Sequence, residues 1–182
     1  KDFGLDPIIV GGAGAASRVA DLQKAGAKVI YGVNFRGGAG APGGRGGGGG
    51  GGGGGDSLRV MQMLADAPKV PAVLAKAGVP FAFSGGGTIL PADFVRNAAR
   101  TVKEGGLTPE AALKALTIEA ARIAGAADRV GSIEQGKIAN IVVTDGDLFE
   151  ASTRVRHVFI DGRPIEITGA GSGRGGRGGG SR

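Results

Sequence analysis

Apolar residues along the chain fall into short continuous runs separated by amphipathic stretches. Three such runs occupy residues 7–12, 28–33 and 79–84, of which the first ends in glycine and the third in serine. Runs of this length are typical of strands buried on both faces, as in a parallel sheet. Residues 15–25 carry apolar positions at helical spacing and end at Gly26. The first two strands and the helix between them therefore predict a right-handed βαβ unit.

Residues 56–77 also show helical periodicity, with Asp56 or Ser57 placed to cap the helix. Pro68 and Pro71 interrupt the pattern. Because proline cannot donate the backbone hydrogen bond of a helix interior, we expect two helical pieces with a kink between them.

Two further helices are predicted after the third apolar run. Residues 91–104 form an amphipathic stretch that a pair of glycines ends. Thr108 followed by Pro109 is a helix-start signal, and Thr117 is placed to cap a second short helix. One buried stripe is expected at Leu113, Leu116, Ala120 and Ile123.

The C-terminal third changes to β character. Residues 139–144 and 155–160 have strand composition, and a further strand is expected at residues 164–167. Asp161-Gly162 between the last two strands is a strong hairpin signal. Turn positions also suit Asp145 and Asp147, and the lone His157 lies within the second of these strands.

Glycine and positive charge are concentrated in two tracts. Of the 40 glycines, 15 lie between residues 37 and 55 and 8 between residues 169 and 180. We predict a flexible loop at residues 36–55 and a disordered tail at residues 169–182, because ordering glycine costs backbone entropy and buries no side chain. Five arginines in or beside the tracts carry most of the +6 net charge, so the folded part is not expected to bind nucleic acid. Weak, salt-sensitive binding through the tail is an alternative.

Several functional classes find no support in the sequence. The absence of cysteine excludes disulfides and thiolate metal sites. Neither a signal peptide nor a membrane-length apolar run is visible, which is compatible with a cytoplasmic location but leaves the compartment open. Gly12-Ala13-Gly14 opens a helix after a strand, but Ser17 stands where a dinucleotide fingerprint requires glycine or alanine. A tight turn is the preferred interpretation.

A longer motif runs through residues 106–163. It comprises Glu110-Ala111-Ala112-Leu113, Thr117, Ala120-Ala121, Gly131-Ser132-Ile133-Glu134, Gly136-Lys137-Ile138-Ala139-Asn140 and Val158-Phe159-Ile160-Asp161-Gly162. The motif resembles the C-terminal end of the amidohydrolase superfamily, nearest its imidazolonepropionase-like branch. Asn140 replaces the usual aspartate and Glu119 the usual proline. Lys137 is then expected to be a structural feature of the loop.

The resemblance implies an α/β fold that is the C-terminal half of a (β/α)8 barrel plus a small antiparallel β unit. The expected organisation is a barrel-like segment at residues 1–125, the β unit at residues 126–168 and the tail at residues 169–182. The three strands leave open sheet edges, so a missing N-terminal half or a homo-oligomer is expected to complete the barrel.

The resemblance further implies hydrolysis of C–N bonds, often in cyclic amides, with zinc or another divalent metal at the barrel mouth. The family's metal ligands include histidines on earlier strands and an aspartate after the last strand. Here Gly11-Gly12 and Ser84-Gly85 stand at the strand ends. No catalytic or metal-ligating residue is therefore assigned, and the chain is expected to hold no cofactor and to be catalytically incomplete.

By the general rule for barrels, a small-molecule substrate would contact the carboxyl ends of the strands. Gly12, Asn34 and Ser84 are the predicted substrate-binding residues. The alternative function is a non-catalytic binding or assembly module that uses the open sheet edges.

Overall fold

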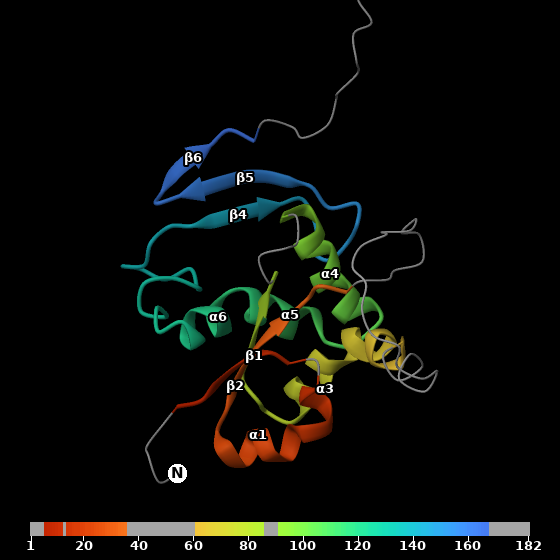
Figure 1. The fold of residues 1–182 in the computed structure, drawn as a ribbon. Coiled ribbons are helices and arrows are strands. Elements are labelled where there is room, and N and C mark those ends of the chain that lie inside the picture. The colour runs from red at the N-terminus through yellow and green to blue at the C-terminus, as the bar shows by residue number, and fades with distance from the viewer. Residues whose placement is uncertain (1–5, 13, 36–60, 86–90, 168–182) are drawn as a thin grey trace, which may run out of the picture.

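The computed structural model describes residues 6–12, 14–35, 61–85 and 91–167 and shows a mixed α/β fold with two separate sheets (Figure 1). The predicted glycine loop, the predicted tail and the caps Asp56 and Ser57 lie outside these residues. The elements in chain order are β1 (Ile8–Gly11), the 3-10 helix η1 (Ala15–Arg18), α1 (Val19–Ala25), β2 (Lys28–Gly32), the 3-10 helix η2 (Ala67–Lys69), α3 (Val70–Lys76), β3 (Phe81–Ser84), α4 (Pro91–Lys103), α5 (Pro109–Leu116), α6 (Ile118–Ile123), β4 (Ile141–Thr144), β5 (Val155–Ile160) and β6 (Arg163–Ile165). Residues 61–66 are also helical.

The three predicted apolar runs form one parallel sheet in the order β1-β2-β3. The register pairs Val10 with Ile30 and Ile30 with Ala82, and pairs Tyr31 with Phe83. Partners across a parallel ladder share a face, so alternate residues of each strand form two distinct sheet faces. The predicted βαβ unit is confirmed.

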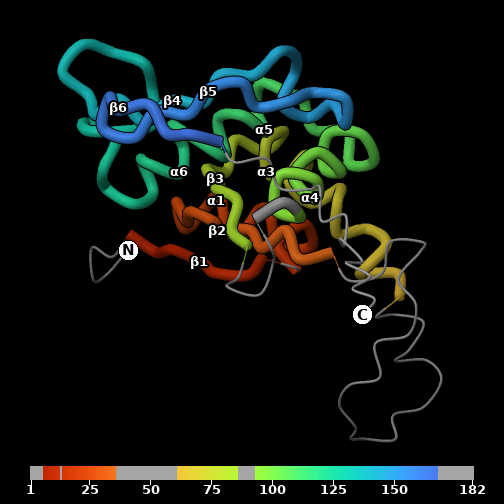
Figure 2. The backbone as a smooth tube through the Cα atoms, turned by 90° about the horizontal axis from the view of Figure 1, so that it is seen from above, coloured from red at the N-terminus to blue at the C-terminus, as the bar shows by residue number. Residues whose placement is uncertain are grey.

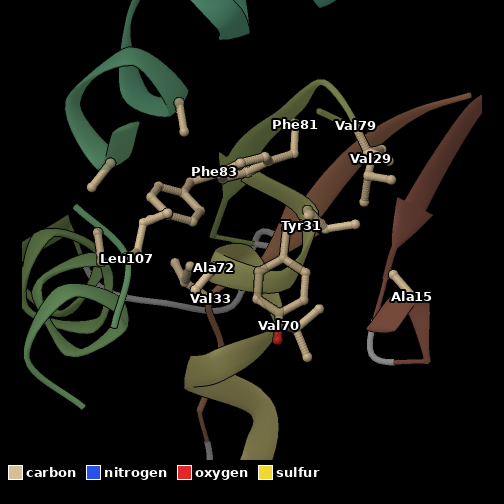
Figure 3. Packing of buried hydrophobic residues seen from close by; sticks show 14 of the residues in the cluster. Ala15, Val29, Tyr31, Val33, Val70, Ala72, Val79, Phe81, Phe83 and Leu107 are labelled. Atoms are coloured by element: carbon tan, nitrogen blue, oxygen red, sulfur yellow. The ribbon is translucent and has the colours of Figure 1, made fainter. Parts of the chain in front are cut away.

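One face of this sheet carries the main core. Tyr31 packs there against Val70 (Figure 3), and its hydroxyl donates a 2.6 Å hydrogen bond to the carbonyl oxygen of Ala67 in η2. The buried side chains on this face come from β2 and β3 and from the helices that cover them: Leu22, Val29, Tyr31, Val33, Val70, Leu74, Phe81 and Phe83. The helical segments around α1 and α3 therefore cover the same face, as right-handed crossovers require.

The opposite face and the β1 edge differ from the sequence prediction. Ile8, Ile9 and Val10 are 45%, 40% and 74% exposed, so the prediction that residues 7–12 are buried on both faces is wrong for this chain. Among the described strands, β1 pairs only with β2 and ends the sheet. The apolar composition of β1 suits a strand that pairs with another strand along each edge. In the described part of the chain, one edge of β1 has no such partner.

Local signals set most helix ends as predicted. Thr108 caps α5 by accepting a 3.2 Å hydrogen bond from the Ala111 amide, and Gly26 ends α1 in a left-handed conformation with φ of +64°. Thr117 precedes α6, but its side chain makes no cap hydrogen bond and instead donates to the Leu113 carbonyl at 2.7 Å. The predicted capping role of Thr117 is therefore wrong: its hydroxyl is directed back to the carbonyl of the preceding turn and accepts no hydrogen bond from the amides that begin α6.

The helices α5 and α6 contact β3 and lie between the two sheets in Figure 1. Ile123 is buried and Leu116 and Ala120 are partly buried, as the predicted stripe requires. Leu113 is 46% exposed, so its predicted burial is wrong. Leu113 faces the antiparallel sheet across open space instead of packing into the parallel-sheet core. Among the described helices, none has the length and apolar character that a membrane span needs.

The second sheet is antiparallel in the order β4-β5-β6 and runs along one side of the molecule in Figure 2. Asp161 and Gly162 form its hairpin turn with φ of +51° and +74°, which is the pattern of a type I′ turn and confirms the prediction. The amide of Asp161 donates a 2.9 Å hydrogen bond to Oδ1 of Asn140. The carboxamide oxygen of Asn140 thus holds the turn. Asn140 stands where the superfamily that the motif resembles usually has aspartate. Phe149, from the loop before β5, is buried in the main core.

Candidate functional site

The carboxyl ends of the three parallel strands lie at one edge of the sheet. Gly12 follows β1 directly, Asn34 lies two residues beyond the end of β2, and Ser84 ends β3. The register pairs Gly32 with Ser84, and the amide of Val33 donates a 2.9 Å hydrogen bond to the Ser84 carbonyl. The structure thus brings the backbones of the three predicted residues to the same edge, and their contact with a substrate stays a prediction.

The glycines at this edge have different environments. A Cβ on Gly12 would lie 3.0 Å from the side chains of both Tyr31 and Val29, and its φ is +72°. Gly12 therefore turns the chain against the core. Among the described residues, a Cβ on Gly32 would meet only the Gly11 carbonyl oxygen, at 4.0 Å, and Gly32 shares its face with Ser84. Gly32, which the sequence did not single out, leaves open space at the edge.

One ion pair lies beside this edge. The guanidinium of Arg100 on α4 stands 5.3 Å from the centroid of the Phe35 ring, next to Asn34. Its Nε and one terminal nitrogen each donate a 2.9 Å hydrogen bond to the Glu104 carboxylate. These hydrogen bonds lower the pKa of Glu104 below its usual value, so the carboxylate stays ionised and its charge cancels that of Arg100.

The strand-end residues do not fit a divalent metal centre. Zinc sites in proteins use thiolate, imidazole or carboxylate ligands, usually at least three from the protein. Gly12, Asn34 and Ser84 provide none of these groups, and no three His, Cys, Asp or Glu residues converge anywhere in the part of the chain that the structure describes. His157 lies on β5 in the other sheet, exposed and beside the Phe159 ring.

The aspartates of the C-terminal part have structural positions, as predicted. Oδ1 of Asp147 accepts a 2.8 Å hydrogen bond from the Phe149 amide and holds the turn before β5. Asp145 accepts a 2.7 Å hydrogen bond from the Arg154 amide and pairs with Arg156 at 2.6 Å. The Arg154 amide and, after it, the Arg156 charge lower the pKa of Asp145. These carboxylates stabilise turns.

A groove that the sequence did not predict lies between α5–α6 and the antiparallel sheet, with a volume of about 1330 Å³. Its walls are mainly aliphatic and include Leu113, Leu116, Ile138, Ile141, Val142 and Val158. Lys137 lines it with a side chain only 11% exposed and donates hydrogen bonds to Ser132 and Glu134 at 2.6 and 3.3 Å. The sequence signals for this groove were the apolar residues of β4 and the apolar stripe along α5. Neither signal shows that these two apolar surfaces face each other without touching.

Gly131 lines this groove, and its replacement by alanine is expected to lower the free energy of unfolding by about 2 to 3 kcal/mol. The φ of Gly131 is +98°, and a Cβ would lie 2.7 Å from the Ala121 Cβ and 3.0 Å from the Ile118 Cα on α6. Gly136→Ala is the control, because Gly136 has a φ of +89° but open space around it, so its cost is backbone strain of about 1 kcal/mol. Urea unfolding followed by circular dichroism measures both variants. Equal midpoints would contradict the packing argument.

Comparisons with known proteins identify relatives of this fold. The sequence model of the amidohydrolase family matches residues 18–165. An amidohydrolase from Thermotoga maritima MSB8 superposes with a TM-score of 0.68 at 27% identity, covering 91% of this chain and 38% of that structure. A Xaa-Pro dipeptidase with bound methionine gives 0.60 at 20% identity, with 91% and 41% covered. A prolidase complexed with N-methylphosphonate-L-proline gives 0.54 at 21% identity, with 88% and 40% covered. No curated protein matches the chain.

The chain thus spans between 38% and 41% of the length of these three solved structures. Its parallel sheet with covering helices corresponds to part of the amidohydrolase barrel, and the antiparallel sheet is the small β unit beside it. The expected fold class is confirmed. Because the family model extends over residues 18–165, the chain belongs to the amidohydrolase family.

Proposed function

We propose that this chain is part of the barrel of a hydrolase that cleaves C–N bonds in cyclic amides, and that its own residues do not compose a complete catalytic centre. Family membership supports the hydrolase class. The cyclic-amide substrate rests on the resemblance of residues 106–163 to the imidazolonepropionase-like branch.

A single observation carries the assignment of the site. The register of β1, β2 and β3 aligns their carboxyl ends, which places Gly12, Asn34 and Ser84 along one edge. In barrels, substrates bind at this end of the strands. A cyclic amide presents a carbonyl acceptor and an N–H donor, and serine, asparagine and backbone groups at the edge have matching hydrogen-bonding chemistry.

The experiment is a two-dimensional NMR titration of the 182-residue chain with hydantoin and, separately, dihydrouracil. We expect the amide signals of Gly32, Asn34 and Ser84 to shift in a saturable manner, while no ring-opened product accumulates. A linear amide of the same size should shift them less. Unchanged signals at the strand ends would refute the site, and ring opening would refute catalytic incompleteness.

Gly32→Val is the blocking variant for this titration. Valine suits a strand, and the nearest atom to a Cβ at this position is 4.0 Å away, so the side chain should occupy the open space without distorting β2. Ile30→Val is the matched control, two residues earlier on the same strand and the same face. Binding should weaken at least about tenfold in Gly32→Val, a change of about 1.4 kcal/mol, and stay unchanged in Ile30→Val.

A further inference from the structure

The carboxyl edge of the parallel sheet carries only uncharged side chains in the described ranges. Gly11 ends β1 and Gly12 follows it, Asn34 and Phe35 follow β2, and Ser84 ends β3. Hydroxyl and carboxamide groups donate and accept hydrogen bonds and keep the same charge between pH 5 and pH 9. The adjacent Arg100–Glu104 pair is internally neutralised by its two 2.9 Å hydrogen bonds. The edge is therefore polar without being charged.

In the described ranges, the groups that could ligate a metal lie away from the edge or are held in ion pairs beside it. His157 lies on the antiparallel sheet, and Asp145 is bonded there to Arg154 and Arg156. On α4, next to the edge, Asp93 pairs with Arg96 and Glu104 pairs with Arg100. Recruiting either carboxylate would break an existing ion pair and leave an arginine uncompensated, which raises the cost of metal binding.

Open space at the edge favours a ligand over a filled core. Among the described residues, a Cβ built on Gly32 meets a single atom, the Gly11 carbonyl oxygen at 4.0 Å, and one built on Gly11, on the opposite face of the sheet, meets nothing within 4 Å. The face that carries Gly32 therefore leaves room for a small molecule beside the backbone of β2. An ion would lose its hydration without gaining charged ligands, whereas an uncharged molecule loses much less.

We infer that the strand-end edge is a metal-free binding site for an uncharged hydrogen-bonding molecule, in contrast to the metal centre implied by the resemblance to the amidohydrolase superfamily. The location of the site rests on the proposed function. The absence of a metal from the edge does not, because it follows from the donor groups that the described residues place there.

The test measures metal content and metal-induced stabilisation of the full 182-residue chain. Chelator-treated protein is incubated with zinc chloride or manganese chloride, passed through a desalting column and assayed by inductively coupled plasma mass spectrometry. We expect well under one equivalent of either metal and no rise in the melting temperature, since a metal that binds the native state raises it. Hydantoin should bind more tightly than its 5-acetate derivative, which is an anion at neutral pH.

Retention of one equivalent of metal that is lost in Asn34→Ala or Ser84→Ala would overturn the inference. Retention that survives both substitutions but is lost in His157→Ala would place the ion on the antiparallel sheet and support a metal-free edge. Tighter binding of the anionic derivative would also overturn it. Failure of both hydantoins to bind would refute the proposed function and leave the metal result standing, so the two failures are distinguishable.

Discussion

Replacing Gly105 with alanine is expected to lower the free energy of unfolding by at least about 3 kcal/mol, which is enough to unfold a marginal domain. A Cβ at this position would lie 1.9 Å from the Pro68 carbonyl oxygen and 2.5 Å from the Thr101 carbonyl oxygen. Both atoms belong to the backbone, so no side chain can rotate away. The end of α4 and the helix η2 would have to separate, and buried residues such as Pro68 would lose contact.

The neighbouring Gly106 provides the control for this experiment. Its φ is +74°, but a Cβ there meets no atom within 4 Å, so Gly106→Ala should cost only about 1 kcal/mol of backbone strain. Urea midpoints from circular dichroism compare the two variants, and a one-dimensional proton NMR spectrum shows whether Gly105→Ala retains dispersed methyl signals if no transition is seen. A Gly105→Ala protein as stable as Gly106→Ala would show that α4 does not approach η2 this closely.

Sequence reasoning succeeded where short-range chemistry decides the structure. Thr108 and Pro109 begin α5, and Gly26 ends α1 because glycine adopts positive φ without steric cost. Asp161 and Gly162 form the hairpin turn because aspartate tolerates positive φ and glycine adopts it without steric cost. Each of these depends on residues within about four positions of one another, so the sequence alone contains the relevant interactions.

Burial depends on distant elements, and two of the burial predictions failed there. The apolar run at residues 7–12 predicted burial on both faces, yet Val10 is 74% exposed because β1 ends its sheet. Leu113 fits the helical stripe of α5 but lies across the groove from the antiparallel sheet. An apolar pattern indicates that a side chain is suited to burial. It does not indicate whether the surface that would bury the side chain belongs to the same chain.

The grouping of the candidate-site residues could be predicted from the sequence, whereas the surroundings of each residue could not. Parallel strands place their carboxyl ends at one edge, so Gly12, Asn34 and Ser84 could be grouped from the sequence once three strands were assigned. The different environments of Gly12 and Gly32 required coordinates, because both are glycines beside a strand end and only distances show which one faces the core. The Arg100 contact with Phe35 joins α4 to the end of β2, and residues so far apart in sequence give no local signal of it.

Raising the pH above 10 is expected to destabilise the fold through Tyr31, the only tyrosine of a chain without tryptophan. Burial raises the pKa of Tyr31 to about 12, from 10.0 for a free phenol, because the core disfavours the phenolate. The unfolded state therefore loses the proton first. The stability contribution of the neutral phenol is complete below pH 10 and is lost as the pH rises from about 10 to about 12. The full loss is about 2 to 3 kcal/mol, since each pKa unit corresponds to about 1.4 kcal/mol.

Absorbance at 295 nm measures this titration without interference, because no other residue of the chain gives the tyrosinate signal. We expect the folded protein to titrate near pH 12, and the urea midpoint to fall between pH 10 and pH 12. Tyr31→Phe is the matched control. It loses the 2.6 Å hydrogen bond to the Ala67 carbonyl, which still accepts from the Val70 amide, so it should cost about 1 kcal/mol at neutral pH. In this variant the part of the alkaline decline that comes from the phenol should disappear. A titration near pH 10 in folded wild-type protein would show that the phenol reaches water and that the packing of Tyr31 against η2 is looser than its 1% exposure indicates.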